Sequence, residues 1–122
     1  MPDEQKLKEL LSTQEYMILS VTLDDGTPWA LPVKIQLQWG NAFEWDSKLD
    51  TEHSKAIAKR PAVAITVFDK TGETQLGFYA RATAKLLNEP KEGFGRYQAI
   101  VSQAWINDET FQKREVVLVD NE

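Results

Sequence analysis

The sequence has no cysteine and a single histidine among its 122 residues. Disulfides, cysteine-based zinc sites, iron–sulfur clusters and thiol nucleophiles are therefore excluded. One histidine, His53, is too few for a histidine-based metal site, so we expect no metal centre. The sequence also contains no Ser–His–Asp set, no glycine-rich phosphate loop and no carboxylate dyad. It therefore predicts no particular catalytic residue.

The chain also lacks a long apolar run and an excess of positive charge. No segment reaches the roughly 18 apolar residues of a membrane span. The charged N-terminus, MPDEQKLKELL, has no signal-peptide core. The net charge of −5 argues against an extended nucleic-acid surface, because phosphate neutralisation dominates such binding. We expect a cytoplasmic protein that folds as one domain over residues 1–122 and binds neither nucleic acid nor membrane.

Alternating apolar residues predict six β-strands, over residues 15–23, 27–39, 42–46, 62–68, 74–88 and 115–119. Helices are expected over residues 2–11, 51–59 and 90–103. The last of these rests on Phe94, Tyr97, Ile100 and Val101, which would share one side of a helix. Short strands with hairpin spacing favour a mainly β protein, a six-stranded antiparallel β-barrel with short helices.

The stretch from residue 27 to 39 shows the most regular alternation. Trp29 and Trp39 belong to its apolar stripe and are expected in the core. Pro28 and Pro32 lie on the opposite face and share parity, so both remove N–H donors from the same side of the strand. The strand is therefore expected at an edge, with backbone open to a ligand or a second subunit.

A polar turn follows the third strand and leads into the second helix. Hydroxyls and cations gather there: Ser47, Lys48, Thr51, His53, Ser54 and Lys55. Two interpretations are open. The turn could be a capped and solvated connecting helix, with Thr51 as N-cap. It could also hold an anion such as a phosphate, since helix-start N–H groups and cations favour one.

Several segments together resemble the pyridoxamine 5′-phosphate oxidase-like family of FMN-binding split barrels. They are the hairpin DDGTPWALPV, the strand end FEWDS, the segment EHSKAIAKRPAVAITVF and the strand GFYARATAKLL. The similarity covers about residues 15–87. It implies a six-stranded antiparallel split β-barrel and a homodimer with flavin bound between the subunits.

The resemblance also implies positions for the cofactor, FMN, with F420 or haem as alternatives. The phosphate would lie at Ser47 and Lys55, with Thr51, His53 and Ser54 as neighbours. The isoalloxazine would lie against residues 29–34. The positions expected to bind the cofactor are Pro32, Val33, Lys34, Trp45, Asp46, Ser47, Thr51, His53, Ser54 and Lys55.

Two functions follow from this resemblance. The first is a small FMN-dependent oxidoreductase of unknown substrate, in which the cofactor carries the chemistry. The second is a non-catalytic binding module that holds flavin, haem or F420, or that has lost its cofactor. The vitamin-B6 oxidases carry an arginine where this chain has Trp29 and Ala30, and they have a C-terminal segment without counterpart at this length, so pyridoxamine phosphate is not the expected substrate. Arg81 is expected in a salt bridge.

Overall fold

The computed structural model describes residues 2–119. Within them the chain forms two helices and eight strands: α1 (Asp3–Thr13), β1 (Tyr16–Thr22), β2 (Pro28–Lys34), β3 (Leu37–Trp39), β4 (Ala42–Lys48), α2 (Glu52–Lys59), β5 (Ala62–Phe68), β6 (Gly77–Lys91), β7 (Phe94–Asn107) and β8 (Arg114–Val116). The mainly β prediction is confirmed, with eight strands in place of six. No helix in this part of the chain has the length and apolar character needed to cross a membrane.

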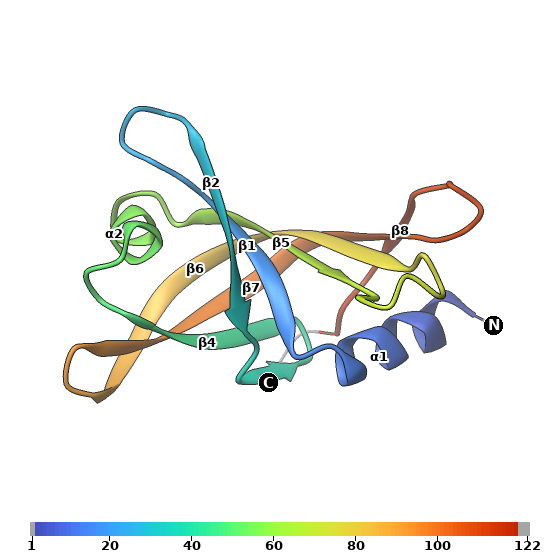
Figure 1. Ribbon diagram of the computed structural model, residues 1–122, viewed down its shortest axis with the longest axis horizontal. Coiled ribbons are helices and arrows are strands. Elements are labelled where there is room, and N and C mark those ends of the chain that lie inside the picture. Colours follow the sequence, from blue (N-terminus) through green and yellow to red (C-terminus); the bar gives the residue numbers. More distant parts are fainter. Residues whose placement is uncertain (1, 120–122) are drawn as a thin grey trace.

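All strands belong to one antiparallel sheet that curls into a small barrel (Figure 1). Its order is β2-β1-β5-β6-β7-β4-β3, and β8 adds to the outer end of β7. The two helices lie at opposite ends of the barrel, with α2 near the β6–β7 hairpin and α1 near the β7–β8 loop (Figure 1). The first two helices, the hairpin at Gly26 and the turn at Gly72 agree with the sequence-based prediction.

Residues 90–103 do not form the predicted helix. Most of them belong to β7, which pairs with β6 along nearly its whole length. The strand alternates up to Val101, with Tyr97, Ala99 and Val101 buried, and shifts by one residue at a bulge after it, so the helix-like spacing of its apolar residues was a coincidence. Gly93, at φ +79°, makes the tight hairpin turn. Gly95 is needed for close packing, because an added Cβ would lie 2.5 Å from Leu86 Cδ1.

The long strand expected over residues 27–39 is broken in two. At the break, the Ile35 N–H donates to the carbonyl of Glu15, just before β1, and the Gln36 N–H donates to the carbonyl of Glu44 on β4. Consecutive N–H groups thus serve opposite sides of the barrel, and the chain changes partner here. Within residues 2–119, β2 pairs only with β1, so the predicted proline edge is confirmed.

The core fills the barrel with aromatic and small side chains. Phe43 stacks on Phe78 at 5.8 Å between ring centroids, and small alanines of β6 line the wall beside them. Trp29 and Trp39, expected in the core, are 47% and 55% exposed. The β1–β2 hairpin, whose second strand includes Trp29, projects past the barrel wall (Figure 1).

Candidate functional site

The polar turn predicted from the sequence is folded into a helix cap. Thr51 Oγ1 accepts the Ser54 N–H at 3.1 Å, the expected N-cap bond. Ser54 Oγ donates to the Lys48 carbonyl at 2.8 Å, which ties α2 to the end of β4. His53 Nε2 lies 2.8 Å from Ser47 Oγ, and both side chains are buried. The hydroxyls of this turn therefore already have partners within the chain.

His53 sits below the surface of the turn, with 7% of its area exposed. Burial lowers the pKa of its imidazole, because the charged form would lose solvation. A neutral imidazole can share one proton with Ser47, as donor or acceptor depending on its tautomer. The geometry makes His53 a structural partner of Ser47.

Cations surround this turn and point outward. Lys48 and Lys55 are exposed, and neither forms an ion pair within the described residues. The sequence reading missed a third cation, Lys91, because it placed that residue in a helix. The β6–β7 hairpin brings Lys91 to Phe94, with Nζ 4.4 Å from the ring centroid, and Phe94 is the partner of Lys48 across the strands. Three lysines thus rim the start of α2.

Lys59 and Arg60 lie at the other end of α2, and both already pair with a carboxylate of the chain. Arg60 Nη2 lies 2.7 Å from Asp24 Oδ1, and its Nε donates to the Thr22 carbonyl. Lys59 lies 3.3 Å from the same carboxylate. These contacts hold the projecting β1–β2 hairpin against α2, so the two cations stabilise the fold.

Two strand edges are open, one on β2 and one on β4, and β4 leads directly into the polar turn. On β2, the Thr27 carbonyl and the Ile35 N–H face β1. Because the backbone groups of successive residues in a strand face opposite sides, the backbone of Pro28, Pro32 and Lys34 faces away from β1. On β4, pairing with β3 ends at Glu44, so the outer edge of residues 45–48 has no strand beside it in the described chain.

The remaining predicted positions differ in access. Pro32 and Lys34 are exposed on the open edge, whereas Val33 is buried in the core. Trp45 is also fully buried and stacks on Tyr97 at 5.8 Å, and its Nε1 has no hydrogen-bond partner among residues 2–119. The ring therefore lies beneath the open edge of β4, where it supports the site from inside.

Asp46 is paired across the sheet with Arg96. The guanidinium also reaches Glu44, with Nη1 3.3 Å from Oε1. The hydrogen bond that Arg96 donates to Asp46 is the main cause of a raised pKa of the Arg96 guanidinium, which therefore stays charged. Arg96 is consequently neutralised, and the lysines are the cations left to bind an anion at this end.

The arrangement fits a phosphate-bearing planar group in its cations and its backbone. Exposed lysines at a helix start attract phosphate, and open strand edges offer backbone groups to the polar rim of a ring. The hydroxyls of Ser47, Thr51 and Ser54 do not fit the predicted role of binding the phosphate, because their hydrogen bonds are made within the chain. In residues 2–119, no three histidine or carboxylate side chains are grouped to hold a metal ion.

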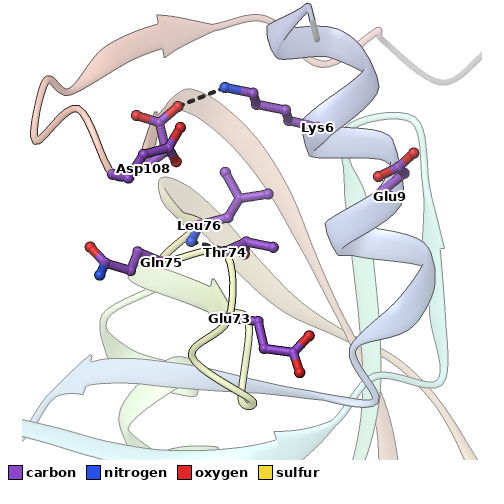
Figure 2. Close-up of a pocket in the computed structure, with 8 residues that line it drawn as sticks. Lys6, Glu9, Glu73, Thr74, Gln75, Leu76 and Asp108 are labelled. Carbon is purple, nitrogen blue, oxygen red and sulfur yellow. Dashed lines mark hydrogen bonds and ion pairs between the residues drawn. The ribbon is translucent and has the colours of Figure 1, made fainter.

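A second polar cluster lies at the α1 end of the barrel. Asp108 is buried and accepts from Lys6 Nζ and from Arg114 Nη2, both at 2.8 Å. Figure 2 shows Lys6 and Asp108 at the wall of a cavity of about 330 Å³ whose floor includes Leu76. Glu9, Glu73 and Glu109 add negative charge around it. An anionic cofactor would be repelled here.

Comparison with known proteins was informative only at the level of structure. No protein-family description matches the sequence, and no curated protein matches it significantly. Among solved structures, a Clostridium acetobutylicum protein related to general stress protein 26 of Bacillus subtilis, of the pyridoxinephosphate oxidase family, superposes with a TM-score of 0.80. It is 11% identical, and the match covers 95% of this chain and 96% of that one.

Two further structures have the same architecture. HutZ, the haem storage protein of Vibrio cholerae, matches with a TM-score of 0.75 and 14% identity, over 91% of this chain and 97% of its own. An F420 reductase matches with a TM-score of 0.67 and 16% identity, over 80% and 94%. The chain therefore has the pyridoxamine 5′-phosphate oxidase-like split-barrel fold, as the sequence resemblance predicted.

Proposed function

We propose that the protein binds FMN at the start of α2 and acts as a small flavin-dependent oxidoreductase. The observation that carries this proposal is the set of exposed lysines that form no ion pair within residues 2–119, Lys48, Lys55 and Lys91, beside the open edge of β4. In a chain of net charge −5, exposed lysines that form no ion pair beside a helix start favour a phosphate group.

The residues would divide the work of binding. Lys55 and Lys48 would hold the phosphate by charge-assisted hydrogen bonds. The exposed edge around Pro32 and Lys34 would orient the ring, with Trp45 packed behind the edge of β4. When bound, a flavin supplies hydride and electron transfer, and the protein supplies orientation and electrostatics.

A homodimer is part of the proposal, with flavin between the subunits. Several apolar side chains remain exposed around the open edge and on the neighbouring sheet face, among them Trp29, Trp39 and Phe68, each about half exposed. Large exposed apolar surface on a small domain favours association. A second copy would cover this surface and close the site. Light scattering that returned only a particle of 13.9 kDa at micromolar concentration would contradict the dimer.

The direct test is to purify the protein and record its absorption spectrum, then titrate it with FMN. The FMN-loaded protein would be assayed with NADH or NADPH and, separately, with pyridoxamine phosphate. We expect flavin reduction by a nicotinamide and no turnover of pyridoxamine phosphate, because the part of β2 at Trp29 and Ala30 offers no arginine for a second phosphate. Rapid pyridoxamine phosphate turnover would overturn the assignment.

A non-catalytic binding module is the second candidate. Two structures with this fold are named for haem storage and for F420 reduction, so the barrel accommodates different ligands. The hydroxyls of Ser47, Thr51 and Ser54 already form hydrogen bonds within the chain. Fewer hydrogen-bond donors are therefore free for a phosphate than the sequence suggested. FMN binding without reduction by any nicotinamide, or binding of haem or F420 in place of FMN, would favour this candidate.

A further inference from the structure

The arginines of the chain are nearly all neutralised by carboxylates. There are four, and three form ion pairs: Arg60 with Asp24, Arg96 with Asp46, and Arg114 with Asp108. Arg81 is the exception, since it has no carboxylate partner in residues 2–119 and the predicted salt bridge is not found. With 19 acidic and 14 basic residues in the chain, an arginine without an acidic partner needs an explanation.

Arg81 is held on the outer face of the sheet. Its Cζ lies 5.6 Å from the centroid of the Trp105 ring, and Lys113 Nζ lies 5.1 Å from the same centroid. Glu115 pairs with Trp105 across β7 and β8, yet it forms no ion pair with either cation. The ring fixes the guanidinium by a cation–π contact, and the cluster keeps a net positive charge.

The surface beside Arg81 is recessed, and its small side chains are exposed. A shallow depression of about 410 Å³ adjoins the guanidinium, and small side chains of the neighbouring strands line it, including Ser20, Ala62, Ala64 and Ser102. Ala62 and Ala64 are exposed although β5 is a central strand of the sheet. This face therefore has the shape to accept another surface at close range, with Arg81 at its border.

Arg81 cannot reach the polar turn of its own chain. Ser47 pairs with Gly95 on β7, whereas Arg81 pairs with Gln103 on the same strand. The separation of eight residue steps from Gly95 to Gln103 corresponds to roughly 25 Å along a strand. In addition, Ser47 points into the barrel and Arg81 points out of it.

We propose that Arg81 supplies the arginine of the flavin phosphate site in trans, so that each phosphate is bound by Lys55 of one subunit and Arg81 of the partner subunit. The proposal rests on the proposed function. A guanidinium binds phosphate through two parallel hydrogen bonds, which lysines cannot do, and each subunit has only lysines unpaired at its own turn. The uncovered sheet face would place Arg81 at the subunit boundary.

The experiment is a complementation between two defective subunits. Arg81→Ala and Lys55→Ala would each be tested alone for FMN and riboflavin binding by flavin fluorescence, with Lys70→Ala as an exposed control. Each single homodimer should bind FMN roughly 10- to 100-fold more weakly, as expected for a lost charged hydrogen bond. Riboflavin, which has no phosphate, should be affected far less. Arg81→Lys should recover part of the loss.

The two variants would then be co-expressed with different affinity tags, and the mixed dimer purified through both. A site in trans leaves one intact site and one doubly defective site, so the mixed dimer should bind FMN tightly at about half of the wild-type stoichiometry. Absence of tight sites in the mixed dimer would overturn the proposal, since Arg81 would then act within its own chain.

Other outcomes also decide the matter. Unchanged FMN affinity in Arg81→Ala, with wild type binding FMN, would overturn this inference and leave the proposed function standing. A monomeric Arg81→Ala, seen by light scattering with an unchanged circular dichroism spectrum, would make Arg81 an interface residue and would also overturn it. Failure of wild type to bind FMN would instead overturn the proposed function, and this inference with it.

Discussion

The two ends of the barrel each bury a polar cluster, but the clusters are built from different groups. At the α2 end, Ser47, His53 and Ser54 share neutral hydrogen bonds. At the α1 end, Asp108 is held by the charged side chains of Lys6 and Arg114. Hydrogen bonds from Arg114, Lys6 and Thr110 hold the pKa of Asp108 far below its usual range. Figure 1 places the two ends apart along the longest axis of the molecule.

The difference suggests two roles: the α1 cluster holds the fold together, and the α2 cluster is the candidate binding site. In the α1 cluster every cation has a carboxylate, and Arg114 also pairs with Asp3, so α1 is tied to the β7–β8 loop. In the α2 cluster the neutral groups satisfy one another, and the lysines around it form no ion pair in the part of the chain that the structure describes. Uncompensated charge on a rigid frame is what an anionic ligand requires. We therefore propose the α2 end as the functional end, and the following variants test that division.

The largest effect is expected from Asp108→Asn. The change leaves Lys6 and Arg114 without their shared carboxylate in a partly buried position, where an unpaired charge is costly. Urea unfolding should show a larger fall in midpoint than for any variant below, while FMN affinity of the folded protein stays near wild type. Glu109→Gln, an exposed neighbour, serves as control. Equal midpoints for the two variants would mean that the charged cluster is no clamp.

The next effect concerns binding. Lys55→Ala should weaken FMN binding by about 1.5–3 kcal/mol, the usual contribution of a hydrogen bond to a charged group. Lys48→Ala should cost less, because an exposed charge beside a loop contributes about 0–1 kcal/mol. Flavin fluorescence titration of both variants compares them directly. Identical affinities would remove Lys55 from the centre of the phosphate site.

A smaller effect is expected from Thr51→Ala, which removes the N-cap of α2. Loss of such a cap costs typically about 1 kcal/mol of stability. Because the hydroxyl serves Ser54 and Lys48 within the chain, FMN affinity should change little. Thr51→Ser keeps the acceptor and should retain the stability of wild type. A strong loss of FMN affinity with unchanged stability would show that this hydroxyl binds ligand after all.

The sequence predicted most of the architecture because alternation is local information. The strand at residues 62–68, the N-cap at Thr51 and the proline edge were readable from spacing and from the chemistry of single residues. The β6–β7 hairpin was not, because the apolar residues of residues 90–103 fit a helical period as well as a strand. Gly93, which the predicted helix would have included, makes the turn between the two strands.

The candidate site was predicted in outline only. The residue types around α2 indicated an anion site, but hydrogen-bond partners depend on tertiary packing, and packing turned Ser47 and His53 toward each other. Lys91 enters the site through the hairpin that the sequence did not reveal. Arg81 was expected in a salt bridge, and only the register shows that no carboxylate lies opposite it.

The smallest effect expected is a pH dependence from His53. Burial lowers its folded-state pKa from 6.5, so the unfolded chain binds the proton more readily. The stability contribution of neutral His53 is therefore complete above pH 6.5 and is lost as the pH falls through the lowered pKa. One such group changes stability by at most about 1.4 kcal/mol per pH unit. His53→Gln keeps a hydrogen-bonding group near Ser47 without titrating.

Urea unfolding at about pH 7.5 and 5.5 would measure the contribution of His53 to the pH dependence of stability, because most carboxylates titrate below that window. Asp69, with its pKa lowered to about 2 by the Thr71 and Thr74 hydroxyls, stays ionised throughout, as does Asp108. Wild type should lose stability over this interval, and His53→Gln should lose less. The charged α1 cluster should contribute nothing to the change, so Lys6→Gln, although less stable overall, should keep the wild-type slope. A slope that disappears with Lys6→Gln and persists with His53→Gln would reverse the assignment of the two ends.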